Sequence, residues 1–208
     1  MIHYTIWGNV PEISYEDSFN KLKIDNQDVF LELVDILDYN LKYNKTKALP
    51  YEDNEVPLEL YATYDRLQIM AAFGKTTEVY KYPSREGVMF LSEKNTDIFW
   101  VTINKNEEDY IPSTMYNDYA INNELFHWES QSTTSATSPT GIRYITDTSK
   151  EHKVLFFVRE IGKGSPYVFL GNAKYVSHKG SNPIQIIWKM EHSIPEKIIS
   201  SSKLKVLV

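Results

Sequence analysis

The residue types best suited to ligand chemistry are concentrated between Pro112 and Tyr144, in PSTMYNDYAINNELFHWESQSTTSATSPTGIRY. This stretch combines aromatic rings, one histidine, carboxylates, amides and a long run of hydroxyl groups. Aromatic faces beside carboxylates and amides suit a planar polar ligand such as a nucleobase, because rings stack on its face while polar groups hydrogen-bond its edge. The composition therefore indicates a polar–aromatic pocket.

The segment FHWESQ, residues 126–131, is the centre of this candidate pocket. In an extended chain, Phe126, Trp128 and Ser130 share one face and the three intervening polar residues share the other. The alternative is an exposed strand whose polar face meets only water. The candidate base-binding residues are Tyr116, Asp118, Tyr119, Phe126, His127, Trp128, Glu129 and Gln131. On this hypothesis, Trp128→Ala removes a preference for modified DNA while the domain stays folded.

The hydroxyl-rich run STTSATS, residues 132–138, has two interpretations. It is either a flexible linker or an ordered loop whose hydroxyl and backbone N–H groups contact phosphates. Further cationic and hydroxyl groups follow in the last third of the chain. The candidate contacts to a DNA backbone are Ser132, Thr133, Thr134, Arg143, Lys174, Ser177, His178 and Lys179.

Common catalytic and metal-binding motifs are absent. The sequence contains no P-loop, GxSxG or HExxH motif, and its five histidines lack metal-ligand spacing. Glu151-His152-Lys153 matches half of a nuclease motif, but the nearest upstream acid is Asp147, too close to stand on a separate strand. We therefore expect no catalytic residue, no metal site and no cofactor in this chain.

Composition and charge indicate an ordinary globular protein of 208 residues. There is no cysteine, no apolar run long enough for a membrane span and no signal-peptide pattern, so we expect a cytoplasmic protein without membrane association. The charge is unevenly distributed: residues 1–59 hold 12 acidic and 5 basic residues, and residues 141–208 hold 5 acidic and 11 basic ones. A basic last third suits a phosphate backbone, although chance and a solvated acidic helix explain the split equally well.

The chain pattern predicts a small helical connector over residues 1–57 and a larger domain over residues 58–208. Residues 1–26 show no regular pattern, residues 26–42 have helical apolar spacing, and residues 43–57 have the composition of a linker. In the larger domain, Asp65 to Gln68 form a capping box for a short helix, and a final helix begins near Pro195. Strands are predicted at 87–91, 97–104, 153–159, 167–170, 174–178 and 183–190. We expect an α+β fold with a curved mixed β-sheet or pseudobarrel and flanking helices.

Several co-linear blocks between residues 58 and 196 resemble a known family. They include LELYATYDRLQIMAAFG, TDIFWVTINK, STMYNDYAINNELFHWESQSTTS, SPTGIRYI and YVFLGNAKYVSHKGSNPIQIIWKMEHSIP. These blocks resemble the C-terminal domain catalogued as DUF3427, and in particular the C-terminal region of SauUSI-type enzymes. Those are ATP-dependent Type IV restriction endonucleases, active in phage defence, with a phospholipase-D-like nuclease and a superfamily 2 helicase upstream.

The resemblance implies a DNA-binding target-recognition domain that reads 5-methylcytosine or 5-hydroxymethylcytosine, by base flipping in a fold like that of SRA and PUA domains. It implies double-stranded DNA with modified cytosine as one partner and the upstream helicase and nuclease as the other. ATP and Mg²⁺ are implied only for the parent enzyme, and no catalytic residue is carried over. The alternative is a protein–protein docking module that couples helicase and nuclease without reading DNA.

Overall fold

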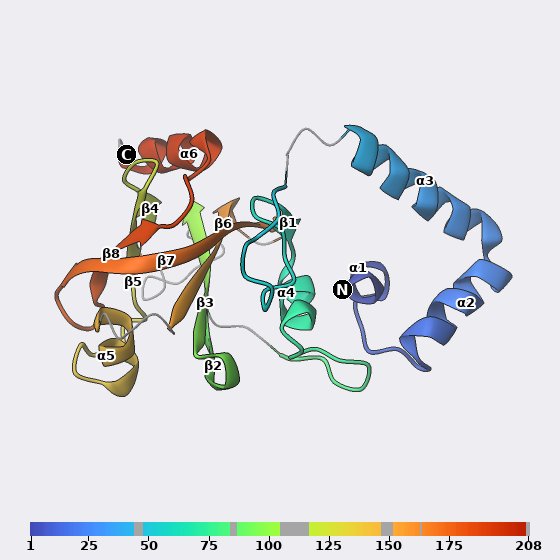
Figure 1. Cartoon of the computed structure of the whole chain (residues 1–208), viewed down its shortest axis with the longest axis horizontal. Coiled ribbons are helices and arrows are strands. Elements are labelled where there is room, and N and C mark those ends of the chain that lie inside the picture. The colour runs from blue at the N-terminus through green and yellow to red at the C-terminus, as the bar shows by residue number, and fades with distance from the viewer. Residues whose placement is uncertain (44–47, 84–86, 105–116, 147–151, 163, 207–208) are drawn as a thin grey trace. The chain divides into compact units, whose positions relative to one another are not determined.

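A computed structural model describes residues 1–43, 48–83, 87–104, 117–146, 152–162 and 164–206 (Figure 1). The chain forms two compact units, Met1–Ser84 and Arg85–Val208. The division predicted from the sequence, after residue 57, lies inside the first of these units. As a statement about domains, it stays a prediction.

The first unit is built from helices. They are α1 (Ile2–Trp7), α2 (Tyr15–Asp25), α3 (Gln27–Tyr43) and α4 (Arg66–Ala72), and a two-residue strand β1 (Thr63–Tyr64) precedes α4. The predicted capping box is present: the Asp65 carboxylate accepts the Gln68 N–H at 2.8 Å, and the Gln68 side chain accepts the Asp65 N–H at 2.8 Å. This reciprocal pair satisfies two N–H groups that a helix start leaves free, so α4 begins where the sequence predicts.

The prediction that residues 1–26 are irregular is wrong, because α1 and α2 lie there. Helix α2 begins at Ser14, whose hydroxyl accepts the Asp17 N–H at 3.0 Å. Its residues are mostly polar and none is buried, so it lacks the apolar spacing by which helices are recognised. The serine cap followed by acidic residues in the first turn was the available signal.

The second unit is a curved sheet with two longer helices. Its strands run in the order β2-β3-β6-β7-β8-β5-β4, all antiparallel except the parallel pair β3–β6. Helices α5 and α6 lie at opposite ends of this sheet (Figure 1). The α+β class with a mixed sheet and flanking helices is therefore confirmed. The elements are β2 (Val88–Leu91), η1 (Ser92–Lys94), β3 (Thr96–Asn104), β4 (Tyr119–Ala120), β5 (Leu125–Glu129), α5 (Pro139–Ile145), β6 (Lys153–Ile161), β7 (Tyr167–Lys179), β8 (Gln185–Met190) and α6 (Glu196–Val206).

The inner face of the sheet forms one aromatic core. Phe99 of β3 stacks on Trp128 of β5 with ring centroids 4.2 Å apart, although β6, β7 and β8 lie between these strands in the sheet. Phe156 and Trp188 pack against Phe99 at 5.3 and 5.8 Å. A flat sheet would hold β3 and β5 far apart, since neighbouring strands are spaced by about 4.8 Å. The sheet therefore curls on itself around these rings.

Two predicted strands, at 167–170 and 174–178, are one continuous strand, β7. Gly171 and Asn172, which lie between the two predicted strands in the sequence, are inside it. The pairing with β6 shifts register here, and Gly171 has φ of 81°. Glycine adopts this left-handed conformation without a steric penalty, so the irregularity bends the strand instead of ending it.

Candidate nucleic-acid interface

The strand register places many of the candidate residues on one side of the sheet. Opposed residues of antiparallel strands share a face, so Ser177, Ile187, His127 and Tyr119 form one row and Lys179, Gln185 and Glu129 form the next. Lys174, Lys189 and Leu125 form a third row on the same side. We call this side the outer face, and its ten residues are Tyr119, Leu125, His127, Glu129, Lys174, Ser177, Lys179, Gln185, Ile187 and Lys189.

An aromatic pair lies at one edge of the outer face. The Tyr119 ring stacks on the His127 ring with centroids 4.7 Å apart and planes 15° apart. The His127 Nδ1 atom lies 2.7 Å from the Asn117 carbonyl oxygen. A carbonyl only accepts, so Nδ1 carries the proton, and in the neutral ring Nε2 is left as an acceptor. Tyr119 is half-buried and His127 is buried, with 7% of its surface exposed, so the Tyr119 ring is the more accessible member of the pair.

A carboxylate and an amide lie in the next row. Glu129 accepts the Gln185 side-chain N–H at 3.1 Å and the Asn117 backbone N–H at 3.0 Å. Asp118 is buried, and its carboxylate accepts the Glu129 backbone N–H at 3.0 Å. Asp118 thus fixes the segment 117–119 against β5, a positioning role, while Glu129 and Gln185 stay half-buried on the outer face.

Cationic and hydroxyl groups lie at the other edge, on β7. Lys174, Ser177, His178 and Lys179 are all exposed. Lys174 pairs with Glu191 at 3.2 Å, whereas Lys179 forms no ion pair within the described residues. His178 pairs with the buried Ile186, so it lies on the other side of the sheet from the outer face. Its Nδ1 atom is hydrogen-bonded to the Tyr175 hydroxyl at 2.7 Å. Four predicted backbone contacts are therefore gathered on one exposed strand.

The hydroxyl-rich run is an ordered loop. The Ala136 N–H donates to the Ser181 hydroxyl at 3.1 Å, and the Asn182 N–H donates to the Thr134 carbonyl at 3.3 Å, so the loop is bound to the β7–β8 turn. Of the three predicted phosphate ligands here, Thr133 is exposed, Ser132 is half-buried and Thr134 is buried. Because Thr134 is buried, only the first two are accessible to a phosphate.

The rings of Phe126 and Trp128 are buried, with 0% and 4% of their surfaces exposed. They point to the inner face, where Trp128 stacks on Phe99 and Phe126 packs against Phe156 at 5.5 Å. Their predicted sharing of one strand face is correct, but that face is the core. We therefore leave both rings out of the proposed interface; Gln131 is half-buried beside it, and Tyr116 lies outside the described residues.

Arg143 contacts a carboxylate inside the protein instead of an open surface. Its guanidinium donates to the buried Asp97 at 2.7 and 3.0 Å, and His152 Nε2 lies 2.8 Å from the same carboxylate. The guanidinium also lies over the Phe90 ring, 3.9 Å from its centroid. Burial opposes the charged form, but Asp97 and Tyr144 together raise the pKa of Arg143 above its ordinary value. Its assignment as a phosphate ligand is corrected accordingly.

Sequence reasoning missed Asp97, Gln185 and Ile187. Asp97 lies in the strand DIFWVTIN, where a single acid among apolar residues signalled a buried charge that needs a partner. Gln185 and Ile187 are found only through register, because β8 pairs with β5 across a long sequence separation. Ile187 is half-buried beside His127 and adds an apolar group to the outer face.

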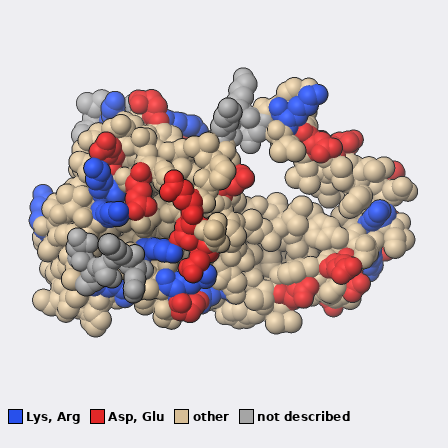
Figure 2. All heavy atoms as spheres, in the orientation of Figure 1, with Lys and Arg blue, Asp and Glu red and all other residues tan. Residues whose placement is uncertain are grey.

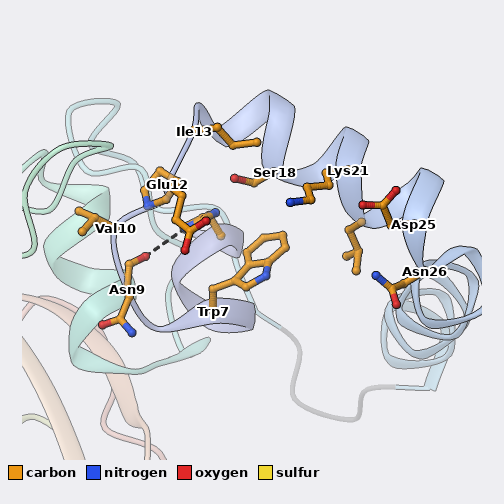
Figure 3. A pocket seen from close by; sticks show the side chains of 12 residues that line it. Trp7, Asn9, Val10, Glu12, Ile13, Ser18, Lys21, Asp25 and Asn26 are labelled. Carbon is orange, nitrogen blue, oxygen red and sulfur yellow. Dashed lines mark hydrogen bonds between the residues drawn. The ribbon is translucent and has the colours of Figure 1, made fainter.

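The first unit holds a separate hollow of about 430 Å³, lined by residues of α1, α2 and the segment between them (Figure 3). None of the candidate residues lines it. Among the described residues, no group of histidine and acidic side chains is arranged to hold a metal ion. No helix in the described ranges is long and apolar enough to cross a membrane.

The fold and the outer face together define an α+β domain with a polar and aromatic sheet surface. The family described as Domain of unknown function (DUF3427) matches residues 58–201. The chain belongs to this family. No curated protein matches the sequence.

Two solved structures are similar at low identity. One is Arabidopsis thaliana SUVH6 in complex with SAM, with 15% identity and a TM-score of 0.44 over 85% of this chain and 34% of that one. The other is the DNA modification-dependent restriction endonuclease AspBHI, with 11% identity and a TM-score of 0.39 over 75% of this chain and 80% of that one. This chain thus spans about a third of the SUVH6 chain.

Proposed function

We propose that this chain is a DNA-binding target-recognition domain and that the outer face is its DNA interface. The observation that supports the proposal best is the register of β7, β8, β5 and β4. It puts the cationic side chains of Lys174 and Lys179 on the same face as the stacked pair Tyr119 and His127. A phosphate-binding edge and a base-binding edge then lie on one surface.

The cationic edge would bind the DNA backbone. Lys179, Lys174 and the Ser177 hydroxyl project from β7, and Thr133 is exposed on the loop bound to the adjacent turn. Phosphate contacts of this kind release condensed counterions, so affinity falls steeply with salt. They position the duplex but carry no sequence information.

The aromatic edge would read a modified cytosine. The Tyr119 ring would stack on the base, and His127 Nε2 would accept from the cytosine amine. The 5-methyl group would contact Ile187 or Leu125, which lie beside His127. Burying one methyl is worth about 0.8 kcal/mol, a preference of about fourfold over unmodified cytosine. Stronger discrimination would need a second site or coupling to other domains.

To contact a modified cytosine, the domain must either flip the base out of the duplex or read its edge in the major groove. Flipping costs a few kcal/mol of stacking and pairing, which the ring stack and edge hydrogen bonds would offset. The 5-methyl group also projects into the major groove, where a sheet face reads it without extrusion. We favour extrusion because a stacked aromatic pair suits an unstacked base better than a paired one.

In a longer protein, this domain would direct an upstream helicase and nuclease to modified DNA. Restriction would then be ATP-dependent and of Type IV, with ATP and Mg²⁺ bound by those other domains. On this proposal, the present chain supplies recognition and no catalysis. Incubation with DNA and Mg²⁺ should leave the DNA uncut.

The experiment is a fluorescence-polarisation titration of DNA duplexes at a series of salt concentrations. Lys179→Gln should weaken binding to every duplex and reduce the slope of log K against log salt by about 0.9. The matched control is Lys203→Gln, which removes the same charge from an exposed position of α6 and should leave the slope unchanged. Equal effects of both variants would place the interface elsewhere. No binding even at low salt would favour the docking module.

A further inference from the structure

Helix α3 presents an unusually apolar surface to solvent. None of its 17 residues is buried. Leu41 is 87% exposed and Leu37 is 52% exposed, and Val29, Val34 and Ile36 are exposed as well. A helix with this many large apolar residues is normally packed on one side. Within the first unit, α2 packs against it, where Lys23 lies over the ring of the half-buried Phe30.

Most of the apolar residues of α3 lie on one side of the helix and form a stripe. At 100° per residue, seven apolar residues lie within about 160° of the helix, and Asn40 stands between the first two of them and the rest: Ile36, Val29, Leu33, Leu37, Phe30, Leu41 and Val34. Glu32 borders this stripe beyond Ile36, and Asp38 borders it beyond Val34. Asp28 and Asp35 lie on the remaining side, together with the exposed Leu31. The stripe therefore has a carboxylate along each edge, and Figure 2 shows acidic groups in red among the tan residues of α3.

These carboxylates are not neutralised by the described residues. Asp28, Glu32, Asp35 and Asp38 form no ion pair or hydrogen bond there through their side chains. Any partner that covers the stripe must therefore bury apolar surface and also meet negative charge on both sides. Burial of the stripe stabilises the complex, and opposite charges at the rim raise its association rate and specificity.

We propose that α3 is a docking site for a helix of another protein or domain, with an apolar face bordered by lysine or arginine on both sides. A second copy of α3 would bring its own carboxylates against these, which disfavours self-pairing. An anionic membrane surface would be repelled for the same reason. This proposal concerns α3 alone and does not depend on DNA binding by the outer face.

The probe is a labelled amphipathic peptide of leucine and lysine, compared with a leucine and glutamate peptide of the same pattern. Binding to the whole chain is followed by fluorescence polarisation. The lysine peptide should bind at least about tenfold more tightly than the glutamate peptide. Leu37→Gln with Leu41→Gln should weaken it about tenfold or more, while circular dichroism shows the helix content kept.

A charge-reversed variant makes the test specific. Glu32→Lys with Asp38→Lys should invert the preference, so that the glutamate peptide binds better. The control Glu16→Lys with Glu52→Lys reverses two exposed carboxylates elsewhere in the same unit and should leave the preference unchanged. Equal binding of both peptides would overturn the proposal. The proposal would also be overturned if the chain self-associated in sedimentation or bound to anionic vesicles, and if the substitutions of Leu37 and Leu41 abolished that association or binding.

Discussion

Phe99 and Trp128 stack with their ring centroids 4.2 Å apart and their planes 14° apart, from strands separated by three others in the sheet. Both rings are buried, and Tyr144 of α5 meets each of them edge to face. The contact joins β3 and β5, each next to an edge strand of the curled sheet, and attaches α5 to them. It is therefore a structural contact that also determines where the outer face lies.

Trp128→Ala should destabilise the protein by about 3–5 kcal/mol, because it leaves a large cavity where the sheet closes. The hypothesis from sequence, that this variant stays folded and loses only its DNA preference, is replaced by this expectation. Urea unfolding followed by fluorescence measures the change. Tyr119→Ala on the outer face is the control and should cost less than about 1 kcal/mol. Similar losses in the two variants would contradict the assignment of Trp128 to the core.

Arg143 and Asp97 form a pair whose loss should appear in stability and not in DNA binding. Asp97→Ala should cost about 3 kcal/mol, because it leaves the guanidinium without its buried partner. Arg143→Lys keeps the charge but loses the two-point contact, and should cost about 1 kcal/mol. Neither change should alter the salt slope of DNA binding. A reduced slope in Arg143→Lys would restore Arg143 as a phosphate ligand.

Gly141 explains how the hydroxyl-rich loop is held against α5. A Cβ at this position would lie 2.0 Å from the Ser135 carbonyl oxygen and 3.0 Å from Ile184 Cδ1. Gly141→Ala should therefore displace the loop and cost about 1–3 kcal/mol in urea unfolding. Gly87→Ala is the control, since its Cβ would lie 3.7 Å from the nearest atom, the Trp100 carbonyl oxygen. If the loop were as flexible as its composition suggests, Gly141→Ala and Gly87→Ala would lose similar amounts of stability.

Glu160 gives α6 a pH-dependent attachment to β6. Burial raises its pKa, but hydrogen bonds from Lys197 and Ser201, at 2.5 and 2.7 Å, outweigh this and lower the pKa below its ordinary value of 4.5. A carboxyl with a lowered pKa in the folded state stabilises it above pH 4.5, and this stabilisation is lost as the pH falls through the lowered pKa.

Glu160→Gln should therefore be less stable than the natural protein by up to about 1 kcal/mol near neutral pH, since Lys197 is well exposed. The difference should shrink as the pH falls. Urea unfolding of both proteins from about pH 7 down to about pH 3 measures it, because the loss falls below pH 4.5. A difference that stays constant or grows towards acid would show that the carboxylate charge is not what holds α6.

The sequence predicted those parts of the fold that depend on local pattern. The α4 capping box and the placement of Phe126 and Trp128 on one strand face needed only neighbouring residues, and both are present. The sequence alone did not determine which face of this strand enters the core, because only the pairing of β5 with β8 distinguishes the core side from the solvent side. The sequence hypothesis treated Phe126 and Trp128 as ligand-binding rings, whereas burial assigns that side to the core.

Ion pairs between residues far apart in the sequence could likewise not be predicted from neighbouring residues. Arg143 stands in a segment of hydroxyls and aromatics, which made it resemble a phosphate ligand. Its partner Asp97 is 46 residues earlier, and only the folded sheet brings them together. Lys179 is exposed and forms no ion pair within the described residues, and its role as a contact to the DNA backbone stays a prediction.

The most direct measurement of the central claim compares the affinity of the chain for two duplexes that differ only in a single 5-methylcytosine. The natural protein should bind the methylated duplex about fourfold or more tightly. Tyr119→Ala and His127→Ala should reduce this ratio to about one while keeping the salt slope that Lys179 supports. Equal affinity of the natural protein for both duplexes, or an unchanged ratio in both variants, would contradict the account.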